Sequence, residues 1–361
     1  MMSKWAVMAL ALAVSGTAVA QEPPRTGPVL VYAHRGASAL RPEHTLAAYA
    51  QAIHDGADVV EPDLVSTRDG ALVARHENEI GSTTDVAQHP EFASRKTTKV
   101  VDGERITGWF TEDFTLAELK TLRARERLPA LRGTRWDGQF QLVTLDEIID
   151  FVAAEAAANH RAIGLIPEIK HPSYFHSIGL PMEDKVLATL QAHAYTRSAT
   201  VTIQSFETDN LRYLRTRIHD RPNIRLLQLL SSENVTLPDA GGPDKGKHYA
   251  DLETPQGLRE VATYADAIGP SLDSIMPRTA DGRLMAPTPL IQNAHAAGLR
   301  VEPYTFRPEN NFLPVEYRKG TSPATRNDKG MIAVIHKFMD AGVDAFFTDD
   351  PALGRRAVDQ R

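Results

Sequence analysis

Residues 59–76 read Val59-Val-Glu-Pro-Asp-Leu-Val-Ser-Thr-Arg-Asp-Gly-Ala-Leu-Val-Ala-Arg-His76 and contain two short apolar segments, 59–64 and 72–76. Only the stretch Thr67-Arg-Asp-Gly70 separates the two segments. Because parallel neighbours need a crossover of about a dozen or more residues, a link of this length predicts an antiparallel hairpin. This hairpin decides how the remaining strands are counted.

Apolar segments alternate with amphipathic segments of helical length along the chain, which is typical of βαβ units and a parallel sheet. The predicted strands are 29–33, 59–64, 72–76, 162–168, 199–203, 224–230, 266–269, 300–304 and 344–348. The predicted helices include 46–55, 145–159, 183–193, 208–217, 289–297 and 331–341. With 72–76 assigned to the hairpin, eight strands remain, and we predict an α/β fold, a TIM (β/α)8 barrel.

The alternation breaks between residues 77 and 140. This stretch is polar and rich in Gly and Pro, and its one clear helix start is the capping box Thr115-Leu-Ala-Glu118. We therefore predict a barrel domain over 28–354 with an inserted subdomain, 77–140, over the C-terminal rim of the barrel.

The first twenty residues have the pattern of an export signal. Lys4 supplies a positive charge, residues 5–14 are apolar, and Ala18-Val-Ala20 is a small-residue cleavage site. We predict a signal peptide over 1–20, cleaved after Ala20, and a periplasmic location. The apolar run is too short for a comfortable membrane span and no later run is longer, so we expect no stable membrane insertion.

Composition narrows the class of protein. The net charge of −6 argues against general affinity for nucleic acid or anionic membrane surfaces. The chain has no cysteine, which excludes a disulfide framework and a lipid-modified N-terminus. A monomer and a homodimer both stay open.

Active sites of parallel barrels lie at the C-terminal ends of the strands. The polar residues at these ends are His34 and Arg35, Glu61 and Asp63, Glu168 and Lys170, Gln204 and Ser205, Glu302 and Tyr304, and Asp349, with His76 at the end of the hairpin. Glu61 and Asp63 are two residues apart and point to the same side of a strand. Two carboxylates cannot share a dry pocket without a cation, so a metal site is predicted.

The residue types indicate which metal and which substrate. Three carboxylates, Glu61, Asp63 and Glu168, form a hard oxygen site suited to Ca²⁺ or Mg²⁺. Arg35 and Lys170 flank this site, as basic groups that grip a phosphodiester do. Two imidazoles, His34 and His76, can serve as base and acid on opposite sides of one phosphorus.

Several motifs extend from the first barrel strand to the last. They are Ala33-His-Arg-Gly-Ala37, Pro42-Glu-His-Thr45, Glu61-Pro-Asp-Leu64, Thr83-Thr-Asp-Val86, Asp113-Phe-Thr-Leu-Ala-Glu-Leu119, Pro167-Glu-Ile-Lys170, Val261-Ala-Thr-Tyr-Ala265, Ile268-Gly-Pro270, Pro303-Tyr-Thr-Phe-Arg307 and Phe347-Thr-Asp-Asp-Pro351. With these motifs the chain resembles the glycerophosphodiester phosphodiesterases, specifically their periplasmic branch. The resemblance covers essentially the whole chain after the leader.

The resemblance implies roles for individual residues. It implies metal binding by Glu61, Asp63 and Glu168, catalysis by His34 and His76, and phosphate binding by Arg35 and Lys170. It also implies calcium as the cofactor and a small glycerophosphodiester, such as glycerophosphocholine or glycerophosphoethanolamine, as the substrate. The chain departs from the family where Glu77, in place of the usual Asp, follows His76, and where the longer basic and aromatic run after Pro129 is missing.

Other residues at the rim receive weaker assignments. Glu43 is expected either to cap a helix that begins near Thr45 or to take part in substrate binding. Tyr304 is expected to wall a glycerol or head-group pocket, or only to pack at the rim. Asp349 is expected to orient a catalytic group rather than to bind metal.

Three other functions fit the sequence less well. A phospholipase-D-like enzyme on intact lipid would need an apolar or basic docking surface, which the acidic balance does not favour. A barrel glycosidase would use Glu61 or Glu168 but would not need Arg35, Lys170 and two histidines. A non-catalytic binding protein would not need both His34 and His76.

Overall fold

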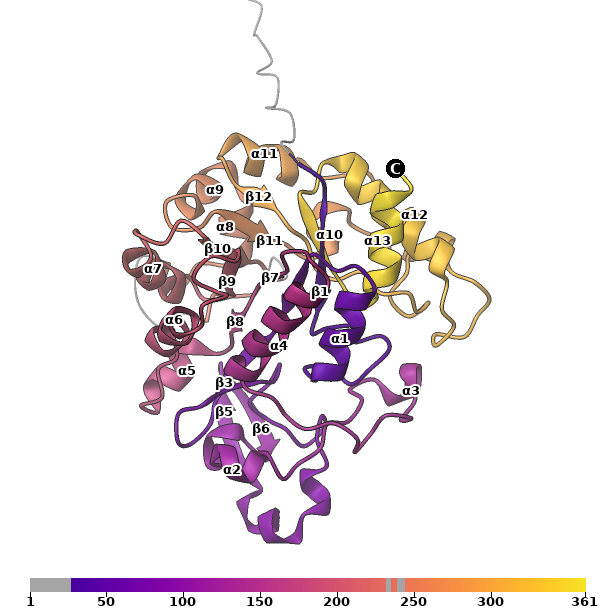
Figure 1. Cartoon of the computed structure of the whole chain (residues 1–361). Coiled ribbons are helices and arrows are strands. Elements are labelled where there is room, and N and C mark those ends of the chain that lie inside the picture. The colour runs from indigo at the N-terminus through magenta and orange to yellow at the C-terminus, as the bar shows by residue number, and fades with distance from the viewer. Residues whose placement is uncertain (1–26, 232–234, 239–243) are drawn as a thin grey trace, which may run out of the picture.

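The computed structural model describes residues 27–231, 235–238 and 244–361 (Figure 1). Its main sheet has the strand order β12-β11-β10-β9-β7-β2-β1-β13, and every neighbouring pair in this row is parallel. The bounds are β1 (Leu30–His34), β2 (Val59–Glu61), β7 (Gly164–Leu165), β9 (Val201–Ser205), β10 (Ile224–Leu229), β11 (Ala267–Gly269), β12 (Arg300–Val301) and β13 (Ala345–Thr348). The predicted signal peptide lies outside the described residues.

The two ends of this row meet and close the barrel. Past β12 the chain continues alongside β13, where the Phe347 N–H donates to the Pro303 carbonyl at 3.0 Å and the Phe306 N–H donates to the Phe347 carbonyl at 2.9 Å. A parallel bridge between Phe306 and Thr348 extends this contact. The predicted eight-stranded (β/α) barrel is therefore confirmed.

The hairpin that decides the strand count is also confirmed. β3 (Asp63–Ser66) and β4 (Leu72–Ala74) pair antiparallel, with Leu64 opposite Ala74. β3 continues the line of β2 and pairs in parallel with β8 (Glu168–Ile169), which continues β7. The predicted strands 59–64 and 162–168 are each split at a proline, Pro62 and Pro167, because proline has no N–H for the ladder.

Helices follow the strands and surround the barrel in Figure 1. Their bounds are α1 (Leu46–His54), α4 (Leu145–Ala158), α5 (Pro172–Ser177), α6 (Glu183–Ala192), α7 (Thr208–Arg217), α8 (Tyr249–Glu253), α9 (Pro255–Val261), α10 (Leu272–Ile275), α11 (Leu290–Ala296), α12 (Asp328–Ala341) and α13 (Pro351–Asp359), with a short 3-10 turn at Val315–Tyr317. α4 begins at a complete capping box of Thr144 and Glu147. Of the helices in the described ranges, none has both the length and the apolar character needed to cross a membrane.

Residues 77–140 form a layer of short elements between β4 and α4. They are the 3-10 turns Val86–Gln88, Pro90–Arg95 and Thr111–Asp113, the antiparallel pair β5 (Thr97–Val101) and β6 (Glu104–Gly108), α2 (Leu116–Leu119) and α3 (Pro129–Arg132). β5, β6 and α2 are grouped below β3 in Figure 1.

This layer does not have a core of its own. The rings of Phe92 and Phe114 lie 5.0 Å apart edge to face, and both belong to the same buried cluster as Val60 and Leu72 of the barrel and its hairpin. The stretch 77–140 is thus packed onto the barrel, and its standing as a separate subdomain stays a prediction.

Candidate active site

The alternation of side chains along the barrel strands places the polar residues of the rim. Tyr32, Val59 and Phe347 belong to the buried cluster inside the barrel, with the Tyr32 and Phe347 rings 5.2 Å apart. Since side chains two residues apart share a strand face, residues 34, 61 and 349 continue this inner face toward the rim. The barrel interior is therefore apolar below and charged at its C-terminal end.

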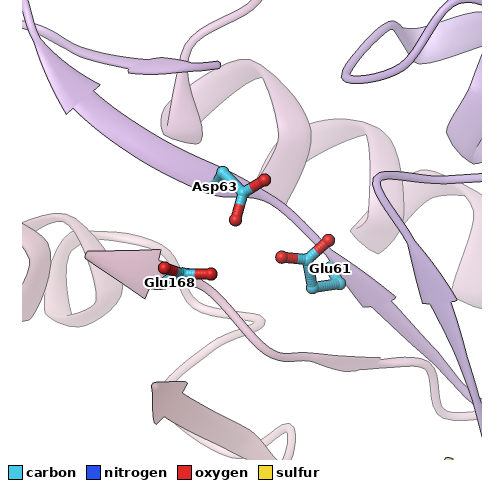
Figure 2. A group of neighbouring side chains, drawn as sticks. All are labelled: Glu61, Asp63 and Glu168. Carbon is cyan, nitrogen blue, oxygen red and sulfur yellow. The ribbon is translucent and has the colours of Figure 1, made fainter. Parts of the chain in front are cut away.

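Three carboxylates meet at this end, as predicted. Glu61, Asp63 and Glu168 each offer an oxygen, and these oxygens lie within 4.8 Å of one another. Figure 2 shows the three side chains pointing toward a common centre, Glu61 and Asp63 from one stretch of chain and Glu168 from its neighbour. All three are buried, with at most 6% of their surface exposed.

The crowding of these buried carboxylates disfavours their charged forms. Burial, followed by the neighbouring Asp63 carboxylate, raises the pKa of Glu61 well above its ordinary value. Burial and Asp63 also raise the pKa of Glu168 to about 8, although the Lys170 ammonium opposes the shift. Within the described part of the chain, Asp63 Oδ1 is buried without a hydrogen-bond partner. An unpartnered buried oxygen beside two further carboxylates is the donor set that a hard divalent cation requires.

His34, at the end of β1, is held by a carboxylate from the end of β13. Its Nδ1 lies 2.6 Å from Asp349 Oδ1. Burial, followed by the Arg35 guanidinium, lowers the pKa of His34 to about 4, and Asp349 only partly offsets these effects. The ring is therefore neutral near pH 7, with Nδ1–H donated to Asp349, and the basic nitrogen is Nε2, which accepts from Arg35 Nε at 3.3 Å.

His76, in the loop after β4, has a carboxylate partner next to it in the chain. Its Nδ1 lies 2.5 Å from Glu77 Oε1, and its Nε2 lies 3.3 Å from the Lys170 ammonium. Burial, then Arg35 and Lys170, lower the pKa of His76 to about 3. The Lys170 ammonium also contacts Glu168 Oε1 at 2.8 Å, so it connects the histidine to the carboxylate triad.

Arg35 turns the chain at the rim. It has a left-handed φ of 60° and is followed by Gly36 at φ 87°, a conformation that directs the Arg35 N–H to Glu61 Oε2 at 2.6 Å. The guanidinium lies 3.1 Å from Glu43 Oε2 and 3.4 Å from Asp63 Oδ2. Glu43 is buried and does not line the cavity described below, so it contacts Arg35 on the side away from that cavity.

A cavity of about 290 Å³ opens above these groups. Its lining residues include the predicted rim residues His34, Arg35, Glu61, His76, Glu168, Gln204 and Tyr304, together with Phe206, which directly follows β9. Tyr304 packs edge to face on Phe206, and its hydroxyl donates to the Leu230 carbonyl at 2.8 Å. Most of the predicted rim residues therefore converge on one hollow that has carboxylates and histidines on its walls, whereas Asp63 and Lys170 are absent from this wall and Lys170 lines a neighbouring cavity.

Comparison with known proteins agrees with this geometry. The model of the glycerophosphoryl diester phosphodiesterase family matches residues 34–353. The chain belongs to this family. A glycerophosphodiester phosphodiesterase of Arabidopsis thaliana is 38% identical over 88% of this chain and 82% of its own length. One from Haemophilus influenzae is 28% identical over 87% of this chain and 89% of its own length.

Solved structures show the same fold. A phosphodiesterase from Oleispira antarctica, solved in complex with the product sn-glycerol-3-phosphate, is 18% identical and superposes with a TM-score of 0.57. The match covers 92% of this chain and 97% of the Oleispira chain. The family match over most of the chain identifies the protein as an enzyme of the phosphodiesterase class.

Sequence reasoning missed several residues of this phosphodiesterase site. His44, to which no role is assigned from the sequence, is fully buried, and its Nε2 lies 2.9 Å from Asp63 Oδ2. Its place in the motif Pro42-Glu-His-Thr45 was a usable signal. Gln204, which the sequence places at the rim without a specific role, donates to Glu61 Oε1 at 3.3 Å.

Three arginines of the site were missed as well. Arg132 and Arg307 donate to Asp349 Oδ2 at 2.6 and 2.8 Å. Arg127 binds both Glu43 and Glu77. Glu302, expected at the rim, instead pairs with Arg300 at 2.8 Å and is absent from the cavity wall.

Proposed function

We propose that this phosphodiesterase hydrolyses glycerophosphodiesters, deacylated phospholipids such as glycerophosphocholine and glycerophosphoethanolamine, to sn-glycerol 3-phosphate and an alcohol. The observation that carries the proposal is the buried carboxylate triad flanked by two histidines that line one cavity. The Oleispira structure, solved with sn-glycerol-3-phosphate as product, supports the same choice of substrate.

The cofactor in this proposal is Ca²⁺, with Mg²⁺ as the alternative, held by Glu61, Asp63 and Glu168. The oxygen-only donor set and the unpartnered Asp63 Oδ1 support a hard cation. When bound, such a cation would stabilise negative charge on a phosphoryl oxygen and lower the pKa of a coordinated hydroxyl.

One histidine removes the proton of the attacking hydroxyl, and the other donates a proton to the departing alkoxide. His34 acts as the base through Nε2, because its Nδ1–H is held by Asp349 and its ring is neutral. His76 acts as the acid on the departing alkoxide. Burial first, and then the positive charges of Arg35 and Lys170, hold its pKa low, and the negative charge of a bound phosphodiester offsets the two cations. Substrate binding thus favours the protonated ring that an acid requires.

The remaining residues bind the substrate. Arg35 and Lys170 place a guanidinium and an ammonium on either side of the triad, where they would contact the phosphate oxygens. Glu43 acts through Arg35, to which it is bound at 3.1 Å. Tyr304, on the cavity wall with Phe206, would pack against the glycerol backbone.

A second cavity of about 570 Å³ shares His76, Glu168 and Phe206 with the first. Among its described lining residues are Asp102 and Glu104 at the tip of the β5–β6 hairpin, whereas His34 lines only the first cavity. If His76 protonates the leaving oxygen, the alcohol departs toward this second cavity. We therefore propose that residues 77–140 contribute to the choice of head group.

An assay of glycerol 3-phosphate release tests the activity and the metal together. Several glycerophosphodiesters and an intact phospholipid would be incubated with enzyme alone, with EDTA, and with EDTA followed by excess Ca²⁺ or Mg²⁺. We expect release from the deacylated substrates, its loss in EDTA and its recovery with Ca²⁺. Full activity in chelator would refute the metal, and preference for intact lipid would refute the substrate class.

The histidine roles are tested with a leaving group that needs no proton. His34→Ala and His76→Ala should each lower the turnover of glycerophosphocholine on the order of 10²–10⁴-fold. A nitrophenyl phosphodiester should largely rescue His76→Ala and should not rescue His34→Ala. Equal rescue of both variants, or of neither, would overturn the assignment of base and acid.

A further inference from the structure

Two arginines from one short segment reach both sides of the active site. Arg127 precedes α3 (Pro129–Arg132), and Arg132 is the last residue of that helix. Both belong to residues 77–140, and neither lines the first cavity. Each instead contacts the carboxylate that holds one of the two histidines.

Arg127 forms a bidentate ion pair with Glu77, the hydrogen-bond partner of His76. Its Nη1 donates to Glu77 Oε1 at 2.9 Å and its Nη2 donates to Oε2 at 2.6 Å. Glu77 Oε1 is also the atom that lies 2.5 Å from His76 Nδ1. Because a guanidinium fork fixes the plane of a carboxylate, Arg127 also fixes the direction from which His76 is held.

Arg132 contacts the carboxylate on the other side through one hydrogen bond, beside Arg307, which donates to the same Asp349 oxygen at 2.8 Å. Its Nη2 donates to Asp349 Oδ2 at 2.6 Å, and Asp349 Oδ1 holds His34. Its Nε donates to Glu309 at 2.7 Å and its Nη1 donates to the Ser38 carbonyl at 2.9 Å. Only 7% of the Arg132 side chain is exposed, so its orientation is fixed by these contacts.

We propose that Arg127 and Arg132 are positioning residues, one for each histidine, through which residues 77–140 set the orientation of both rings. The assignment rests on the proposed roles of His76 as acid and His34 as base. It differs from a purely structural role of the arginines, because it predicts that loss of each one harms a different proton transfer.

The experiment compares Arg127→Met and Arg132→Met on two substrates, glycerophosphocholine and a nitrophenyl phosphodiester, in the full chain with Ca²⁺. Each variant should lower kcat for glycerophosphocholine about 10- to 100-fold, as loss of an outer-shell partner commonly does. The nitrophenyl substrate should restore Arg127→Met close to the wild-type rate, and Arg132→Met should stay impaired. Equal loss on both substrates in both variants would overturn the proposal.

A matched control comes from the same segment. Arg125 pairs with Asp137 at 3.2 Å and contacts neither histidine partner, so Arg125→Met should leave both rates near wild type. A loss in Arg125→Met as large as in the other two variants would show that the segment acts only as a structural support. Circular dichroism of each variant checks that it folds.

Further variants isolate the individual contacts. Arg127 also binds Glu43, so Glu43→Gln should raise KM through Arg35 without dependence on the leaving group. Glu77→Gln should reproduce the pattern of Arg127→Met. If Arg132→Met fails to fold, Arg132→Lys keeps the charge but has one nitrogen in place of the three that donate to Asp349, Glu309 and the Ser38 carbonyl, and it should be impaired on both substrates. A wild-type rate in Arg132→Lys would overturn the positioning role of Arg132.

Failure of this proposal is distinguishable from failure of the acid and base roles. If His34→Ala and His76→Ala lose the same fraction of their rate on both substrates, the proposed catalytic roles of the two histidines are refuted. If the histidine variants separate the substrates and the arginine variants do not, only the positioning role is refuted.

Discussion

His34 and Asp349 lie 315 residues apart in the chain, yet Nδ1 of the one is 2.6 Å from Oδ1 of the other. They meet because β1 and β13 are neighbours in the closed barrel, with Ala33 opposite Thr348. Each residue directly follows that register, so the pairing of the first and last strands brings the imidazole to its carboxylate.

Asp349→Asn tests this pairing. Burial alone raises the pKa of Asp349, but Arg307, Arg132 and His34 outweigh it and hold the pKa well below the ordinary value. The carboxylate is therefore ionised at every working pH, and its loss should lower kcat on the order of 10²–10⁴-fold at pH 6 and pH 9 alike. Steady-state rates at several pH values measure this. A loss confined to one end of the pH range would contradict it.

Metal affinity should depend on pH through Glu168. Because its pKa is about 8 in the metal-free site, this carboxyl is protonated at pH 6 and must lose its proton to bind a cation. The pKa of Glu61 is also raised well above its ordinary value, so this carboxyl must lose its proton as well, and we expect Ca²⁺ affinity to rise by about tenfold or more per pH unit between pH 6 and 8. Titration calorimetry in buffers of different ionisation enthalpy would also detect the released proton.

Glu168→Gln provides the control for this pH dependence. It should bind Ca²⁺ more weakly and with a shallower dependence on pH, because one of the two titrating carboxyls is gone while Glu61 remains. An affinity of the wild type that does not change between pH 6 and 8 would contradict the prediction.

The tip of the β5–β6 hairpin should influence the choice of head group. Glu104 is exposed and lines the second cavity together with Asp102. Asp102 Oδ2 lies 2.5 Å from His171 Nδ1. Glu104→Gln removes a negative charge that would attract the positively charged choline head group. It should lower the ratio of kcat/KM for glycerophosphocholine to kcat/KM for a substrate with an uncharged alcohol about two- to fivefold, the range of an exposed charge pair. Glu91→Gln, an exposed carboxylate of the same stretch outside that cavity, is the control. Equal ratios in both variants would refute the role of the hairpin.

Gly36→Ala should destabilise the site and the fold together. Gly36 has a φ of 87°, and a Cβ on it would lie 2.7 Å from both the carbonyl carbon and the Cβ of Ala48 in α1. We expect the free energy of unfolding to fall by about 1–3 kcal/mol, measured by urea denaturation. Gly298→Ala has a similar φ of 82° with nothing within 4 Å, so it should cost less. An equal cost would show that backbone conformation, rather than the contact with α1, sets the effect.

The leader is the last prediction. We propose that the chain is exported and cleaved after Ala20, so the mature protein should begin at Gln21. Intact mass of the protein recovered from the periplasm measures the start directly. Protein that retains Met1 would contradict both the cleavage site and the location.

The fold was predictable because its signals are local. Strand-length apolar segments and the four-residue link between 59–64 and 72–76 established the barrel and the hairpin. Strand ends were less predictable: the structure splits two strands at Pro62 and Pro167 and begins α12 at Asp328, three residues before the predicted start. A proline changes the hydrogen-bond ladder without changing the apolar pattern.

The site was predictable where residues lie at strand ends, as Glu61, Asp63 and Glu168 do. Arg127 and Arg132 do not follow from such a rule. They lie in a stretch without periodicity, and their partners Glu77 and Asp349 are 50 and 217 residues away in the chain. Contacts of that kind depend on how a loop packs, for which the sequence carries no short-range pattern.

The core that residues 77–140 share with the barrel restricts how enzymes of this architecture can diversify. Because Phe92 and Phe114 pack into the same cluster as Val60 and Leu72, the stretch cannot be exchanged as a cassette without repacking the barrel. A transplanted loop would also remove the arginines that hold both histidine partners. New substrate ranges should therefore arise by single substitutions at the exposed hairpin tip, where a change of charge leaves the catalytic geometry intact.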